Sequence, residues 1–207
     1  MTSFFKQITE KPWETVPGQA ADAGGGRSID QPIPKVALVV FLCVVTILFW
    51  LFGLVYFERM EIRDWVPLKD PSLLYLNTGV LVLASLVFEW TKRQAKLGFF
   101  RETRVGLIIA GVLTIAFIGG QLMVWNQLVE LGYFIGSNPA NDFFYLLTGL
   151  HGLHMLGGLI AWARTTNKVW FMKVSPEKAA LSVELCAIYW HFLLALWLAL
   201  FAVLINT

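Results

Sequence analysis

The chain has 207 residues, of which 57% are hydrophobic and only 14% are charged. Soluble domains carry about 25% charged residues, so this chain lacks the polar groups needed to cover a surface that faces water. The same hydrophobicity excludes disorder over most of the chain. A net charge of +2, with the basic residues in short segments between apolar runs, gives no indication of a nucleic-acid partner. The composition indicates an integral membrane protein.

The first part of the chain differs from the rest. It has scattered charges and a glycine-rich run, Ala20–Arg27, which is typical of a flexible linker. It has no apolar stretch of about 7–15 residues, which a signal peptide needs. We expect residues 1–33 to form a cytoplasmic tail and linker, and residues 34–207 to form the membrane domain.

Five apolar segments follow, and each is long enough to cross a bilayer. A hydrocarbon core about 30 Å thick needs roughly twenty apolar residues per helix. The candidate spans are Pro34–Phe57, Leu73–Trp90, Val105–Val124, Phe143–Ala163 and Ala180–Ile205. The alternating pattern of β-strands is absent, which argues against a barrel. We therefore expect an all-α integral membrane bundle of five transmembrane helices.

The basic residues predict how this bundle is oriented. Of the 16 Lys and Arg residues, thirteen lie in the N-terminal tail, at Lys35 directly after it, and in the second and fourth connections, and three lie in the first connection. Basic residues near the ends of spans remain on the cytoplasmic side. We expect the N-terminus in the cytoplasm and the C-terminus outside.

Histidine and glutamate within the last two spans are candidate site residues, because a polar group in hydrocarbon needs a partner or a role. His151 and His154 are three residues apart in the fourth span, and Glu184 and His191 are seven apart in the fifth. We expect these four to form a structural polar cluster between the two helices. A metal would need more ligands than this pattern offers, so interhelical hydrogen bonds are the simpler interpretation.

A second set of residues is expected to bring helices close together. Thr148 and Gly152 form a pair of small residues one turn apart, which lets helix backbones approach. The full set of expected packing residues is Thr148, Gly149, Gly152, Gly158, Asn77 and Gln121. For Trp190 and Trp197 we expect ordinary packing or lipid contact. Glu89 is expected to face headgroups beside Lys92 and Arg93. Neither cysteine, Cys43 or Cys186, belongs to a metal or haem motif.

Two motifs stand out in the last two spans: Thr148–His154 reads T-G-L-H-G-L-H, and Glu184 is followed by Tyr189–Phe192, which reads Y-W-H-F. These motifs and the order of the spans resemble the haem–copper oxidase (cytochrome c oxidase) subunit III family, which has T-G-x-H-G-x-H and E-x-x-x-x-Y-W-H-F stretches. Leu76-Asn77-Thr78 opens the second span as the family's L-N-T does. The resemblance runs from about Pro34 to the end of the chain and is to the short, five-helix bacterial form.

The resemblance implies a non-catalytic, multi-pass subunit of a terminal haem–copper oxidase in the bacterial inner membrane. This chain would carry no cofactor and no catalytic residue, and the haems and copper would lie in partner subunits, subunit I among them. The complex would reduce oxygen and translocate protons in aerobic respiration. The implied role of this chain is to support subunit I and to bind phospholipids.

Three carboxylates of the family are absent from this sequence. Thr46, Val124 and Leu194 stand where the family has acids in the first, third and fifth of these helices. This departure leaves open an accessory subunit of a nitric oxide reductase. A small transporter with histidines along its path is a further hypothesis, which the lack of an inverted repeat opposes.

Overall fold

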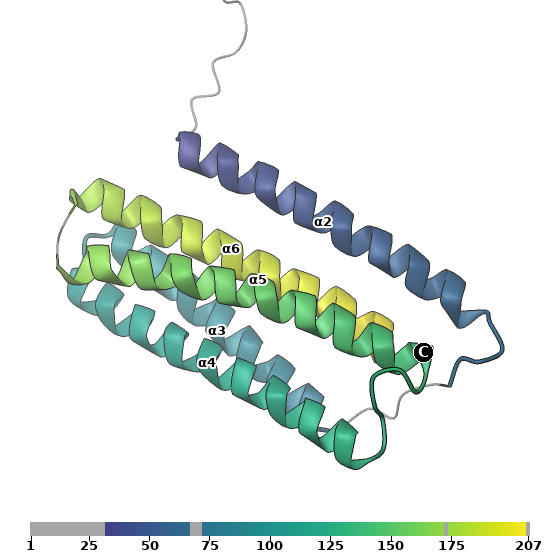
Figure 1. Cartoon of the computed structure of the whole chain (residues 1–207). Helices are drawn as coiled ribbons and strands as arrows, with labels where there is room; N and C mark the ends of the chain where they lie inside the picture. The colour runs from purple at the N-terminus through teal and green to yellow at the C-terminus, as the bar shows by residue number, and fades with distance from the viewer. Residues whose placement is uncertain (1–31, 67–71, 172–173, 206–207) are drawn as a thin grey trace, which may run out of the picture. The chain divides into compact units, whose positions relative to one another are not determined.

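The computed structural model describes residues 32–66, 72–171 and 174–205, and all regular structure in these ranges is helical. The helices are α2 (Ile33–Met60), α3 (Ser72–Lys96), α4 (Phe100–Glu130), α5 (Pro139–Trp170) and α6 (Pro176–Ile205) (Figure 1). All five are long and apolar enough to cross a membrane. The predicted all-α, five-helix membrane architecture is confirmed. Nearly all of the predicted tail lies outside the described residues.

The helices extend beyond the apolar segments that predicted them. The third predicted span, Val105–Val124, lies within a helix of 31 residues, α4. At about 1.5 Å per residue, α4 is roughly 46 Å long. Because the bilayer measures about 40–45 Å with its headgroup regions, the helix ends carry their charged residues into the interface.

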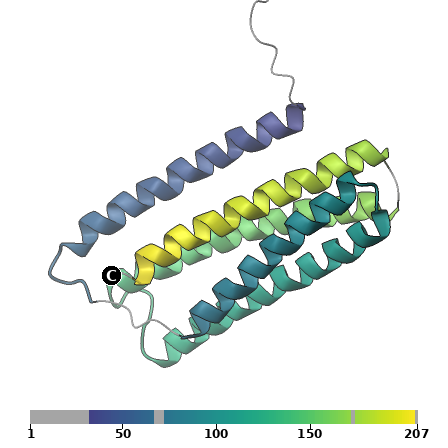
Figure 2. The same ribbon diagram turned by 180° about the vertical axis from the view of Figure 1, so that it is seen from behind.

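Four of the helices form a closed bundle within the unit Pro34–Thr207. Side-by-side packing joins α3 to α4 and α6, and α5 to α4 and α6 (Figures 1 and 2). Large aromatic side chains fill the interior, among them Phe88, Phe117, Trp190 and Trp197. Aromatic side chains of α3, α4 and α6 therefore meet in the centre of the bundle.

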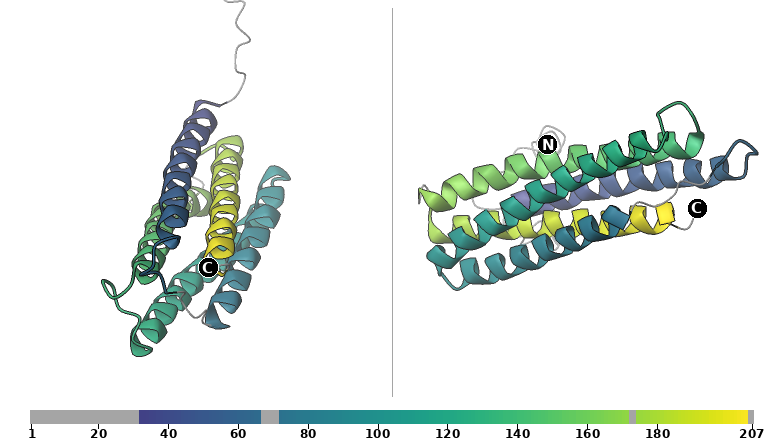
Figure 3. Two further views of the ribbon diagram at one scale, coloured as in Figure 1. Left: turned by 90° about the vertical axis from the view of Figure 1, so that its right-hand side faces the viewer. Right: turned by 90° about the horizontal axis from the view of Figure 1, so that it is seen from below.

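Helix α2 is joined to this bundle by side chains. The Phe49 ring lies 5.5 Å from that of His154 in α5, and the Phe41 ring lies 6.4 Å from that of Tyr189 in α6. Figure 3 shows α2 beside α5 and α6. Only 17% of the most apolar window of α2 is buried, against 33–39% in the other four helices. Most of α2 is therefore left to face lipid or a partner.

The two tryptophans of α6 bond across the bundle. The Trp190 indole N–H donates to Oγ1 of Thr114 in α4 over 3.0 Å, and that of Trp197 donates to Oγ1 of Thr78 in α3 over 2.9 Å. Both side chains are fully buried. Of the two expectations, packing and lipid contact, the structure shows packing inside the protein. Each tryptophan also supplies an interhelical hydrogen bond.

Two glycines are required where helices approach most closely. A Cβ at Gly158 would lie 2.7 Å from the Tyr189 ring, and one at Gly111 would overlap the Trp162 indole. The absence of a side chain at these positions lets α5 pack against α6 and α4, as small residues do in membrane bundles.

Candidate functional site

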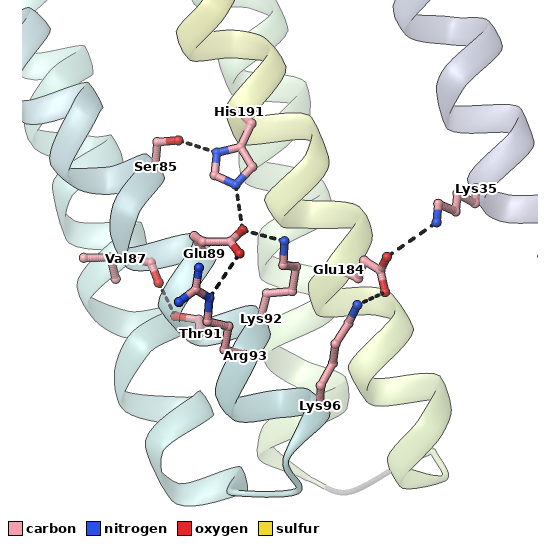
Figure 4. A network of polar contacts seen from close by, with 10 residues as sticks. All are labelled: Lys35, Ser85, Val87, Glu89, Thr91, Lys92, Arg93, Lys96, Glu184 and His191. Atoms are coloured by element: carbon pink, nitrogen blue, oxygen red, sulfur yellow. Dashed lines mark hydrogen bonds and ion pairs between the residues drawn. The ribbon is translucent and has the colours of Figure 1, made fainter.

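The first polar group lies between α3 and α6. Nε2 of His191 is 3.1 Å from Oε2 of Glu89, and Nδ1 of the same ring is 2.5 Å from Oγ of Ser85 (Figure 4). Glu89 also contacts Nζ of Lys92 at 2.5 Å and Nε of Arg93 at 3.3 Å. The carboxylate therefore has an opposite charge or a donor on each side, which offsets the cost of removing it from water.

Glu184 joins three helices close to this network. Its carboxylate lies 3.0 Å from Nζ of Lys96 in α3 and 3.5 Å from Nζ of Lys35 in α2 (Figure 4). It shares a face of α6 with His191, as their spacing of seven residues predicts. That face meets α3, whereas the sequence analysis expected it to meet the helix of His151 and His154.

The two histidines of α5 lie elsewhere. Nδ1 of His154 is 2.8 Å from the carbonyl oxygen of Leu150 in its own helix, and the ring packs on Phe41 and Phe49 of α2. His151 is 1% exposed and packs against Phe117 and Trp197 in the bundle core. The structure thus distributes the four candidate residues over three places.

Helical geometry explains this separation. Residues three apart are about 60° apart around a helix, which suffices to turn His151 toward α4 and α6 and His154 toward α2. The sequence signal that was missed lies in α3. Ser85 and Glu89 are one turn apart on one face, at a spacing that suits two partners for one imidazole ring.

The predicted packing residues form contacts of several kinds. Asn77 donates from Nδ2 to Oε1 of Gln121 over 3.3 Å, which ties α3 to α4. Thr148 accepts from the Trp125 indole over 3.2 Å, which ties α5 to α4. A Cβ added at Gly149 would lie 3.6 Å from the Trp125 ring, whereas a Cβ added at Gly152 would have no neighbour within 4 Å.

A groove runs between α2, α5 and α6. It has a volume of about 510 Å³ and is lined by Leu38, Phe41, Gly157, Leu185 and Tyr189 along its apolar part. Arg164, Lys168 and Ser182 line its other part. The groove thus combines an apolar part with two cations.

At the three positions where the family has acids, this chain has two apolar side chains and one hydroxyl group that bonds within its own helix. Val124 is completely buried in the core, and Leu194 is half-buried against it. The Thr46 hydroxyl donates to the carbonyl oxygen of Leu42 in its own helix over 2.8 Å. Within the described residues, no three His, Cys, Asp or Glu side chains are grouped as metal ligands would be.

Fold and polar groups together define a multi-pass membrane protein whose charged residues gather at helix ends. The family model described as "Cytochrome c oxidase subunit III" matches residues 36–206. A "Probable cytochrome c oxidase subunit 3" of Mycobacterium bovis is 30% identical over 184 residues, which cover 86% of this chain and 90% of the relative. The "Cytochrome c oxidase subunit 3" of Thermostichus vulcanus is 28% identical over 198 residues, covering 92% and 96%.

The chain belongs to the cytochrome c oxidase subunit III family. It is a non-catalytic oxidase subunit, and subunit III of these oxidases carries no redox cofactor of its own. Family membership implies association with other oxidase subunits. Neither the nitric oxide reductase hypothesis nor the transporter hypothesis is supported by these relatives.

Proposed function

We propose that this chain supports the haem- and copper-bearing subunit I of a terminal oxidase in a bacterial inner membrane. The complex reduces oxygen to water and translocates protons, and this chain stabilises it without taking part in electron transfer. The observation that carries the proposal is the family match over residues 36–206, which includes nearly all of the five helices.

The same proposal includes an orientation. The end of the bundle that contains Lys35, Lys96 and Glu184 faces the cytoplasm, together with the α3–α4 and α5–α6 connections. Thirteen of the 16 basic residues belong to this side, which supports the orientation by the preference of Lys and Arg for cytoplasmic segments.

Phospholipid is the second proposed partner, and the groove between α2, α5 and α6 is where it binds. The apolar part of the groove accepts an acyl chain, and Arg164 and Lys168 attract the phosphate from the cytoplasmic side. Neither cation forms an ion pair with another described residue, so both remain available to an anion. Ser182 also lines this part of the groove, and its hydroxyl group, which donates to the carbonyl oxygen of Lys178 over 2.9 Å, adds polar character beside the two cations.

Co-purification tests the function. The chain is tagged and extracted in mild detergent, and the visible spectrum and the oxygen and nitric oxide consumption of the product are recorded. We expect haem bands and oxygen consumption with an electron donor. A preparation that contains the intact chain but no haem, from cells that respire oxygen, would contradict the proposal.

Lipid analysis tests the groove. Phospholipid retained by the purified complex is measured by mass spectrometry for the native chain and for the Arg164→Gln/Lys168→Gln variant. We expect the variant to lose one bound phospholipid per complex. Arg101→Gln is the control, because Arg101 is an exposed cation at the same end of the bundle that does not line the groove. Equal retention in all three proteins would exclude phospholipid from this groove.

A further inference from the structure

A small cavity between α4 and α5 contains polar groups without partners. Its volume is about 250 Å³, and Gln121 of α4 and Thr148, His151 and Gly152 of α5 line it. His151 is 1% exposed and Gln121 is 7% exposed. Among the described residues, neither ring nitrogen of His151 has a hydrogen-bond partner, and Nε2 of Gln121 has none.

The cavity opens on the outer face of the α4–α5 pair. Leu122, Leu153 and Leu156 also line it, and they are 53%, 62% and 51% exposed. Helix α2 contacts α5 and α6 through rings at Phe143, His154 and Tyr189, and none of these three residues lines the cavity. Within the part of the chain that the structure describes, no other helix packs over this face, which leaves it open to a partner from outside.

Surrounding phospholipid does not satisfy these groups because of their depth. At about 1.5 Å per residue, His151 lies roughly 18 Å along α5 from Pro139 and roughly 28 Å from Trp170. It is thus close to the middle of the helix. Phospholipids present only hydrocarbon at this depth, and their hydrogen-bonding groups are at the interface.

Gly152 is a second, independent observation at the same place. A Cβ there would meet no atom within 4 Å, whereas Gly111 and Gly158 are required by the side chains packed on them. Packing among the described residues therefore does not require glycine at position 152. Together with Thr148 one turn away, Gly152 leaves a notch beside His151 where the backbone of another helix can approach closely.

We propose that a transmembrane helix of a partner oxidase subunit packs against this notch and inserts a hydroxyl or amide side chain into the cavity. This inference rests on the proposed function, which supplies the partner. Nε2 of Gln121 can only donate, so the inserted group must accept a hydrogen bond. A neutral imidazole has one donor and one acceptor, so a hydroxyl or amide, which both donates and accepts, is complementary to His151 as well.

A pair of glycine variants tests the notch. The oxidase is purified through a tag on its haem-bearing subunit, and the amount of this chain per haem is measured. For Gly152→Leu we expect retention to fall about tenfold, as when a buried interface position is overfilled. Gly79→Leu is the matched control: Gly79 is an exposed helical glycine of α3 whose added Cβ also meets no atom within 4 Å, and it lines none of the cavities described. Retention of Gly152→Leu at the native ratio would overturn the inference.

Site-specific photo-crosslinking keeps the test independent of folding. A benzophenone side chain replaces Leu153 beside the notch, or Ile47 of α2 as a control of similar exposure at 60%. We expect position 153 to cross-link to a partner oxidase subunit in high yield. Cross-links from position 153 to lipid alone, in a complex that contains the chain, would overturn the inference and leave the proposed function intact. Absence of the native chain from the oxidase would overturn both.

Discussion

Glu89 of α3 and His191 of α6 meet across the bundle, with 3.1 Å between Oε2 and Nε2. The imidazole is fixed on its other side by Ser85, so it bridges two positions of one helix face. A carboxylate, an imidazole and a hydroxyl thus form one connected network, which holds α6 in register with α3.

This network predicts a measurable coupling between the two residues. In a double-mutant cycle with Glu89→Gln and His191→Phe, we expect a coupling energy of about 0.6 kcal/mol, the average for interhelical hydrogen bonds in membranes, and no more than the maximum of about 1.7 kcal/mol. Unfolding of the purified chain in detergent supplies the free energies. A cycle through Glu89 and the exposed Arg93 is the control, and about 0.3–0.5 kcal/mol is expected of such an i,i+4 pair. No coupling between Glu89 and His191 would refute the network.

The indole hydrogen bonds of α6 predict a difference between buried and exposed tryptophans. Trp190→Phe removes the donor to Thr114 and leaves a buried hydroxyl with one partner fewer, which we expect to cost about 1–3 kcal/mol. Trp50→Phe, at a position 69% exposed in α2, should change stability by less than about 0.5 kcal/mol. Thermal unfolding in detergent compares the two, and equal effects would show that the indole bond is of no consequence.

Two adjacent glycines of α5 provide a sharper comparison. A Cβ at Gly158 would lie 2.7 Å from the Tyr189 ring, whereas one at Gly157 would lie 3.9 Å from the Tyr189 hydroxyl oxygen. We therefore expect Gly158→Ala to destabilise the bundle by about 1–3 kcal/mol through overpacking. Gly157→Ala should be neutral or slightly stabilising, because alanine favours helix by about 1 kcal/mol over glycine. Identical unfolding temperatures for the two variants would contradict the close α5–α6 contact.

The sequence predicts some of these features because they depend on periodicity along one helix. The lengths of the apolar segments predicted five spans, and the seven-residue spacing predicted that Glu184 and His191 share one face of α6. Neither signal says which neighbour that face meets. Helix α3 takes that place because α6 packs between α3 and α5, and this order depends on the interdigitation of Trp190, Trp197 and Phe88 in three dimensions.

The same limit applies to the histidines of α5. Their sequence positions suggest one cluster, but a rotation of about 60° between residues three apart sends them to different neighbours. Only the packing of α2 on α5, through Phe41 and Phe49, explains why His154 has aromatic surroundings. The cavity beside His151 was not foreseeable, because it depends on which small residues remain without a neighbour.

The last prediction concerns the orientation of the bundle in the membrane, and it depends on contacts at the two ends of the bundle. Nδ2 of Asn138, at the start of α5, donates to the carbonyl oxygen of Val66 in the α2–α3 connection over 2.6 Å. At the opposite end, Glu184 contacts Lys35 and Lys96. The connections therefore alternate between the two ends of the bundle, as five successive crossings require.

The basic residues then determine which end is cytoplasmic. A reporter enzyme that is active only outside the cytoplasm should be active when it is inserted between Ile135 and Gly136, or fused after Thr207. It should be inactive when it is inserted at Gly98 or Ser175, which lie in the two connections rich in basic residues. Activity at Gly98 would reverse the orientation. Because the α4–α5 connection and the C-terminus are predicted to share a side, activity at one and not at the other would contradict the five-crossing arrangement itself.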